Sequence, residues 1–125
     1  MEYGVTDFYV GHYGRFDSMA AESVILAKTR HPKVKLYLLL PYHPYDRPIS
    51  TPAGFDETYY PPDMERVPKR LAILRANQYM IKTCRYLIAY VRYPSGGSQK
   101  VLEAALPRQK RGELHINNLG GWRTK

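Results

Sequence analysis

Two glycine-containing turns hold residues that could bind a phosphate. The later one, Pro94-Ser-Gly-Gly-Ser98, follows the apolar run Tyr86–Val91 and precedes the helical pattern of Gln99–Leu106. Its glycines allow a ligand to approach the backbone, and the free amides of a following helix attract an anion. An ordinary strand-to-helix turn is an equally weighted interpretation. The predicted ligand contacts of this turn are Ser95, Gly96, Gly97 and Ser98.

A junction of the same kind lies near the start of the chain. The β-rich run Thr6–Val10 ends at Gly11-His-Tyr-Gly14, and Asp17 or Ser18 can cap the helical pattern that follows. The glycine spacing is neither the dinucleotide fingerprint nor a Walker phosphate loop. Two glycine-lined strand ends predict one shared pocket, although His12 alone is equally well explained as a solvated loop histidine. The predicted contacts here are Gly11, His12, Tyr13, Gly14, Arg15, Asp17 and Ser18.

The pattern of apolar runs predicts the elements that position these turns. Strands are expected at 6–10, 34–40, 86–91 and 113–118, helices at 17–30, 67–83 and 98–109, and a long loop at 41–66. This alternation predicts an α/β fold, a single Rossmann-like domain with a mainly parallel sheet of about four or five strands flanked by helices. We expect the domain to cover 1–119 and to be followed by a loose tail, 120–125.

The long loop and the helix after it supply further candidates. The loop begins at the carboxyl end of a strand, so Pro41 and Tyr42 are expected at the pocket, with simple packing of the loop on the domain as an equal alternative. Arg70 and Asn77 fall within the apolar face of helix 67–83, where an unpaired polar group costs about 1–3 kcal/mol. Arg70 is predicted to contact an anion, and Asn77 to bridge to a neighbouring loop. The apolar face itself comprises Val67, Leu71, Ile73, Leu74, Met80 and Ile81.

Size and composition restrict the class of protein. The 125 residues, 44% of them hydrophobic, suit one domain with a single core. The start of the chain lacks the features of a signal peptide, and the single cysteine, Cys84, cannot form an internal disulfide. A cytoplasmic location is therefore expected, with Cys84 as a core thiol. No apolar run is long enough to cross a bilayer, so no membrane partner is expected.

The formal net charge of +8 favours a polyanion or an anionic small molecule as partner. We expect the positive residues to be spread along the chain. We interpret the local cluster Pro107–Gly112 as a helix end, where the helix dipole favours cations. No reading helix or ribbon is evident, so nucleic acid is the least favoured partner. Neither a metal nor a cofactor is expected, because no histidines or cysteines stand at metal-ligand spacing.

The helix expected at 17–30 predicts self-association. Met19 and Leu26 lie on the opposite side of this helix from Ala20, Val24 and Ala27. One side must face the sheet, so the other exposes apolar residues as a stripe. We expect a homo-oligomer, the simplest being a symmetric dimer through helix 17–30 or helix 67–83.

Several of these segments together resemble the SLOG superfamily of Rossmann-like proteins that bind nucleotide ligands, and in particular small bacterial members related to YpsA. The resemblance covers roughly residues 6–119. It implies a nucleotide or nucleotide-derived ligand bound between the two glycine loops, by a protein that acts as a sensor or sequestering module. The segments that carry it are Phe8–Ser18, Leu40–Tyr42, Tyr60–Pro62, Asn77–Met80 and Tyr86–Ala105.

More distant relatives, the Lonely Guy phosphoribohydrolases, imply an alternative activity. Their pattern PGGxGTxxE matches this chain at Gly96, Gly97 and Glu103, whereas Gln99 and Lys100 replace its Gly-Thr pair. The preceding helix of that branch carries an arginine, and this position falls on Ala76, with Arg75 one residue early. The alternative is therefore an N-glycosidase of nucleoside 5′-monophosphates in which Glu103 is the catalytic carboxylate.

Overall fold

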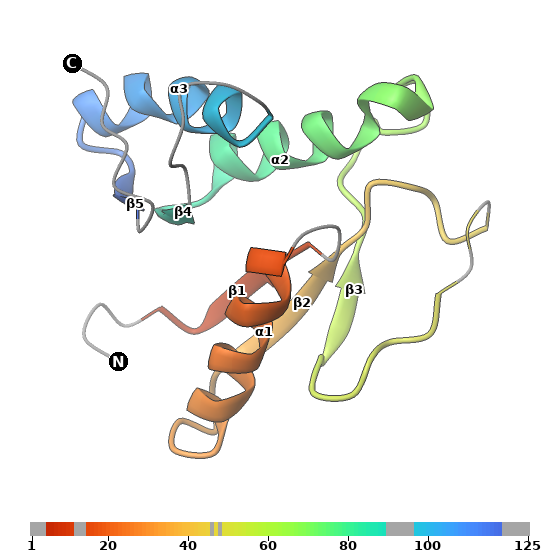
Figure 1. The fold of residues 1–125 in the computed structure, drawn as a ribbon, viewed down its shortest axis with the longest axis vertical. Coiled ribbons are helices and arrows are strands. Elements are labelled where there is room, and N and C mark those ends of the chain that lie inside the picture. Colours follow the sequence, from red (N-terminus) through yellow and green to blue (C-terminus); the bar gives the residue numbers. More distant parts are fainter. Residues whose placement is uncertain (1–4, 12–14, 46, 48, 90–96, 119–125) are drawn as a thin grey trace. The chain divides into compact units, whose positions relative to one another are not determined.

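The computed structural model describes residues 5–11, 15–45, 47, 49–89 and 97–118. The chain divides into two compact units, Met1–Lys69 and Arg70–Lys125 (Figure 1). The expected boundary between a domain at 1–119 and a tail at 120–125 stays a prediction, because 119–125 lie outside the described residues.

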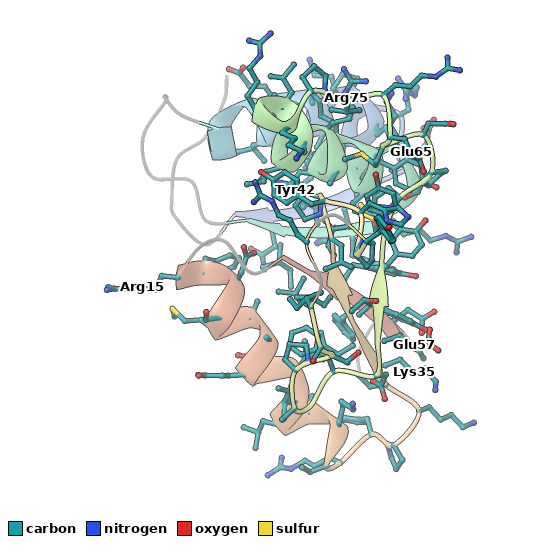
Figure 2. All side chains as sticks on the ribbon, turned by 90° about the vertical axis from the view of Figure 1, so that its right-hand side faces the viewer. Arg15, Lys35, Tyr42, Glu57, Glu65 and Arg75 are labelled. Atoms are coloured by element: carbon teal, nitrogen blue, oxygen red, sulfur yellow. The ribbon has the colours of Figure 1, made fainter. Side chains whose placement is uncertain are left out.

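The first unit is a three-stranded parallel sheet with a helix on one face. Its elements are β1 (Asp7–Val10), α1 (Arg15–Lys28), β2 (Lys35–Leu39) and β3 (Glu57–Tyr59), with the strands in the order β1-β2-β3. Both strand pairs are parallel, with Tyr9 opposite Tyr37 and Tyr37 opposite Glu57. Figure 2 shows Arg15 at the first turn of α1, and Lys35 and Glu57 on the other side of the sheet.

The inner side of α1 packs on the sheet as the apolar pattern predicts. Its small and β-branched residues, with Phe55, cover a cluster formed by Val10, Ala21 and the fully buried Leu36. On the opposite side Met19 is 57% exposed and Leu26 is 71% exposed. The predicted exposed apolar stripe of this helix is thus confirmed. The residues of α1 packed against the cluster are Ala20, Val24 and Ile25.

Strand β3 corrects the prediction of an uninterrupted loop over 41–66. Glu57–Tyr59 adds to β2 in parallel, and the backbone amide of Leu40 donates to the Tyr59 carbonyl at 2.8 Å. The strand is only three residues long and lacks an apolar alternation. Its position depends on the backbone of β2, which the sequence of the loop does not reveal.

The start of β3 is fastened to the end of α1 by an ion pair, here called the Asp56 clasp. The Lys28 Nζ donates to Asp56 Oδ2 at 2.8 Å and to the Gly54 carbonyl at 2.9 Å. The same carboxylate oxygen accepts from the Leu36 amide at 2.8 Å. These two hydrogen bonds, from Lys28 first and then from Leu36, lower the pKa of Asp56. One carboxylate therefore joins α1, β2 and the segment before β3.

The second unit is a two-stranded parallel sheet with two helices on one face (Figure 1). A short 3₁₀ turn (Lys69–Leu71) leads into α2 (Ala72–Thr83), followed by β4 (Tyr86–Ala89), α3 (Gly97–Lys110) and β5 (His115–Asn118). Their shared core contains Ile81, Ala105 and Leu114, with Leu87 and Ile116 packed against it. Tyr86 and His115 lie opposite each other at the amino ends of the strands.

The apolar face predicted for helix 67–83 is only partly right. The residues of α2 that are buried are Ala72, Ala76 and Ile81, whereas Ile73 is 38% exposed. Arg70 lies in the 3₁₀ turn and is exposed, so it is not a polar residue within a buried face. Asn77 is half-buried. Ile81 is thus buried as predicted, whereas Ile73 is not, and the two small alanines that the predicted face left out are also buried.

The ends of α2 and α3 meet through one arginine, here called the Arg108 clasp. Arg108 Nη1 donates to the carbonyls of Ile81 and Cys84, and its Nη2 donates to the Glu113 carbonyl at 3.1 Å. Cys84 packs on the core, and this burial raises the pKa of its thiol. The prediction that the basic cluster after Pro107 marks a helix end is confirmed, because α3 ends at Lys110.

The described strands thus confirm a mixed α/β fold with parallel pairing. They form one sheet of three strands and one of two, and a single sheet of four or five strands stays a prediction. Among the described residues, none of the helices combines the length and apolar character required to span a bilayer.

Candidate functional site

The carboxyl edge of the first sheet brings several predicted contacts together. Because β1, β2 and β3 are parallel, their carboxyl ends open on the same edge. Gly11 follows β1, Pro41 and Tyr42 follow β2 after Leu40, and α1 begins nearby at Arg15. In open α/β sheets this edge is where ligands bind. His12, Tyr13 and Gly14 lie outside the described residues.

Gly11 lies close to an acidic side chain. A Cβ at Gly11 would lie 3.1 Å from Asp17 Oδ2, tighter than most real contacts of this kind. Asp17 stands in the first turn of α1, where the positive end of the helix dipole favours a carboxylate. The prediction that Asp17 or Ser18 caps the helix is wrong, because the helix already begins at Arg15.

This position of Asp17 restricts what the edge can bind. A carboxylate repels phosphate at its own position, but it accepts hydrogen bonds from hydroxyl and amino groups. Arg15 is exposed at the first helical position, and Ser18 is also exposed one turn on. The first turn of α1 therefore carries both a cation and an acceptor, which suits a ligand that has both an anionic group and a hydroxyl.

The loop after β2 contributes aromatic and basic side chains. The Arg47 guanidinium lies 3.8 Å from the centre of the Tyr42 ring, and Tyr42 Oη donates to the Lys69 carbonyl at 3.4 Å. His43 meets Tyr60 edge to face at 5.2 Å between ring centres. Pro41 is buried and Tyr42 is half-buried. The loop is thus packed on its own unit, as the alternative interpretation expected, while Tyr42 still borders the edge.

Arg47 is a candidate that the sequence analysis missed. It follows Tyr42 by five residues in a loop rich in proline and tyrosine, and an arginine stacks on an aromatic ring more readily than a lysine does. That combination of residues in one loop was the available signal. Which tyrosine the arginine would meet depends on the turn, in which the Tyr45 amide donates to His43 Nδ1 at 3.0 Å.

The second unit holds the remaining predicted contacts. Gly97 is the first residue of α3 and Ser98 the second, so this helix begins one residue before the predicted start at 98. Ser95 and Gly96 lie outside the described residues. Arg70 is exposed, Asn77 is half-buried, and Glu103 is exposed on α3. The shared pocket would join residues of both units, and it stays a prediction.

Two further findings complete the site. Within the described ranges, no three side chains of histidine, cysteine, aspartate or glutamate come together in a group that could hold a metal ion. Comparisons with protein-family models, curated proteins and solved structures found no match to this chain.

Proposed function

We propose that the chain binds a nucleotide or nucleotide-derived small molecule, as the resemblance to the SLOG superfamily implies, and acts as a sensor or sequestering module. In this proposal the five strands belong to one Rossmann-like sheet, and the ligand lies at its carboxyl edge between the two glycine loops. The observation that carries the proposal is the parallel β1–Gly11–α1–β2 unit, which brings Arg15 to the edge where Pro41 and Tyr42 also lie.

Each residue of this edge has a role in the proposal. The first-turn amides of α1 and the Arg15 guanidinium bind a phosphate, because both favour an anion. The Asp17 carboxylate accepts hydrogen bonds from ribose hydroxyls, a common role for an acidic residue in nucleotide-binding sheets. Tyr42 offers a ring that is already in contact with Arg47. A ligand of this kind matches the pairing of cation and acceptor described above.

Calorimetry with a panel of mono-, di- and cyclic nucleotides tests the proposal. We expect Arg15→Ala to weaken the binding of the preferred nucleotide at least tenfold, because it removes a charge-assisted contact. Arg30→Ala, which removes an exposed arginine beyond the other end of α1, is the matched control and leaves affinity unchanged. Failure of every nucleotide to bind at millimolar concentration would contradict the proposal.

The N-glycosidase alternative makes a separate prediction. Its arginine position falls on Ala76, which is only 1% exposed, whereas Arg75 is exposed. A phosphoribohydrolase needs a cation on the phosphate, so we expect no free base when the protein is incubated with nucleoside 5′-monophosphates. Base release that is abolished by Glu103→Gln, in a variant that melts like the parent, would establish the enzyme instead.

We also propose that the chain forms a homo-oligomer through α1. Met19 and Leu26 lie two turns apart on its exposed side, and a symmetric contact would cover them in both copies. Light scattering at tens of micromolar is expected to give at least twice the 14.5 kDa mass of one chain. Leu26→Asp should return it to the mass of one chain, whereas Lys33→Asp should not. A monomer mass for the parent protein excludes the proposal.

A further inference from the structure

The positive charge of the protein is concentrated in one unit. Arg70–Lys125 contains eleven lysines and arginines and two acidic residues, whereas Met1–Lys69 contains eight and nine. The second unit therefore carries +9 and the first −1. This corrects the expectation that the charge is spread along the chain. A marked asymmetry between two parts of a chain points to a polyanionic partner for the basic part.

Within the second unit, basic residues from three segments meet at one end. The Arg108 clasp brings the end of α3 to the end of α2, because it bonds to the Ile81 and Cys84 carbonyls. The His115 amide donates to the Arg85 carbonyl at 2.9 Å, which places the start of β5 beside the start of β4. The basic end formed in this way contains Lys82, Arg85, Arg108, Lys110 and Arg111.

The local charges at the basic end do not cancel. Arg111 pairs with Glu113 at 2.8 Å, and Arg108 approaches the same carboxylate at 3.5 Å. In the described part of the chain no ion pair involves Lys82, Arg85 or Lys110, all of which are exposed. Two helix carboxyl ends contribute roughly −0.5 each. After the Glu113 carboxylate and both helix ends are counted, the basic end keeps a net charge of about +3. Its cations therefore do more than neutralise the two helix dipoles.

Two rings lie at the same end of the unit as these cations, at the first residues of β4 and β5. Tyr86 is 38% exposed and His115 is exposed, and their ring centres lie 6.0 Å apart. Their neighbours Leu87 and Ile116 face the core, so the two rings lie on the sheet face away from α2 and α3. Aromatic rings next to a positively charged surface are what proteins use to bind unpaired bases, since each base has a face that can stack.

We propose that the basic end of Arg70–Lys125 binds single-stranded nucleic acid, with Lys82, Arg85 and Lys110 on the phosphates and Tyr86 and His115 against the bases. An anionic membrane is less favoured, because Ile81 of α2 is buried in the core of the unit, and on the described part of the ring-bearing face the exposed aliphatic side chain is Ile88. This site lies at the amino ends of β4 and β5, whereas the nucleotide is proposed to bind at the carboxyl ends of strands.

Fluorescence anisotropy with a labelled 20-nucleotide single strand tests the proposal. We expect the double variant Lys82→Gln and Lys110→Gln to bind at least tenfold more weakly at 50 mM salt. Loss of two phosphate contacts should also reduce the slope of log affinity against log salt by about 1.4. The matched control, Arg30→Gln with Lys33→Gln, changes the net charge equally but lies in the first unit, and should alter affinity less than twofold.

A second variant tests the stacking. Tyr86→Leu keeps an apolar side chain in the strand and should reduce single-strand affinity about tenfold, with little change for a duplex of the same length. Three results would overturn the proposal: equal weakening by the two double variants, no effect of Tyr86→Leu, or binding to phosphatidylserine vesicles without binding to the oligonucleotide. Thermal melting of each variant confirms that it is folded before binding is measured.

Discussion

The Asp56 clasp of the first unit and the Arg108 clasp of the second hold helix ends in different ways. In the Asp56 clasp, Lys28 from the last turn of α1 reaches out to a carboxylate, and both side chains are accessible, at 24% and 31%. In the Arg108 clasp, a guanidinium from α3 reaches the last carbonyls of α2, and its side chain is 18% exposed. The Asp56 clasp is centred on a pair of opposite charges, whereas the hydrogen bonds of the Arg108 side chain run to carbonyl oxygens, with the Glu113 carboxylate more distant at 3.5 Å.

The difference determines what is lost when each clasp is broken. Water can solvate an exposed carboxylate or ammonium group, so an accessible ion pair contributes little. The last carbonyls of a helix have no partner within the helix, and a part-buried carbonyl without a donor is costly. We therefore expect the stability of the second unit to depend more strongly on a single residue than the stability of the first.

The largest effect is expected from Arg108→Met, which keeps the length of the side chain but removes its donors. Two carbonyls at the end of α2 then lose their partner, and the free energy of unfolding should fall by about 3 kcal/mol. Urea denaturation followed by circular dichroism measures this. Arg111→Met is the control, since among the described residues the Arg111 side chain bonds to the exposed Glu113, and this variant should change the denaturation midpoint little. Equal effects of the two variants would refute the comparison.

A smaller effect is expected from glycines, one in each unit, that both adopt a positive φ. Gly54 has a φ of 89° and a Cβ there would lie 2.5 Å from Ile25 Cδ1, whereas Gly112 has a φ of 76° and open space around it. Gly54→Ala should cost about 2 kcal/mol through backbone strain and overpacking, and Gly112→Ala about 1 kcal/mol through strain alone. Thermal melting compares them. A larger loss of stability for Gly112→Ala than for Gly54→Ala would contradict the role given to the contact with Ile25.

The smallest effect, and the one that depends on pH, is expected from Asp56→Asn. The clasp lowers the pKa of Asp56 in the folded chain, so its contribution is complete above the pKa of the unfolded chain and is lost as the pH falls through the folded value. The parent should therefore be more stable than the variant at pH 7, and the difference should shrink below about pH 4. Melting curves from pH 7 to 3 measure it; a difference independent of pH would exclude this origin.

The sequence predicts the helices and the longer strands better than the local contacts. Helix α1 begins two residues before the predicted start, and β2 lies within the predicted 34–40, because long apolar patterns identify elements reliably. Strand β3 was missed, since three residues with no alternation carry no periodic signal. Its pairing is decided by the backbone of β2, whose paired residues lie twenty positions earlier in the chain.

For the site residues too, the positions along the strands were predicted, whereas the contacts between side chains were not. Gly11, Arg15 and Pro41 are brought to one edge because the order of parallel strands follows from the sequence pattern. The contact of Gly11 with Asp17, the stacking of Arg47 on Tyr42 and the bonds of Arg108 were not predicted. All three depend on which side chains meet after the elements pack. The difference in net charge between the two units could not be counted until the structure gave the boundary between them.

The parallel pairing has a consequence for the kinetics of folding. In the first unit β1 pairs with β2 across 28 positions, from Asp7 to Lys35, and in the second β4 pairs with β5 across 29, from Tyr86 to His115. The entropic free-energy cost of closing these two chain segments differs by less than about 0.1 kcal/mol, because this cost varies only with the logarithm of segment length. Loop-closure entropy therefore does not favour earlier folding of either unit. The order in which the two strand–helix–strand segments form is decided by the stability of their contacts.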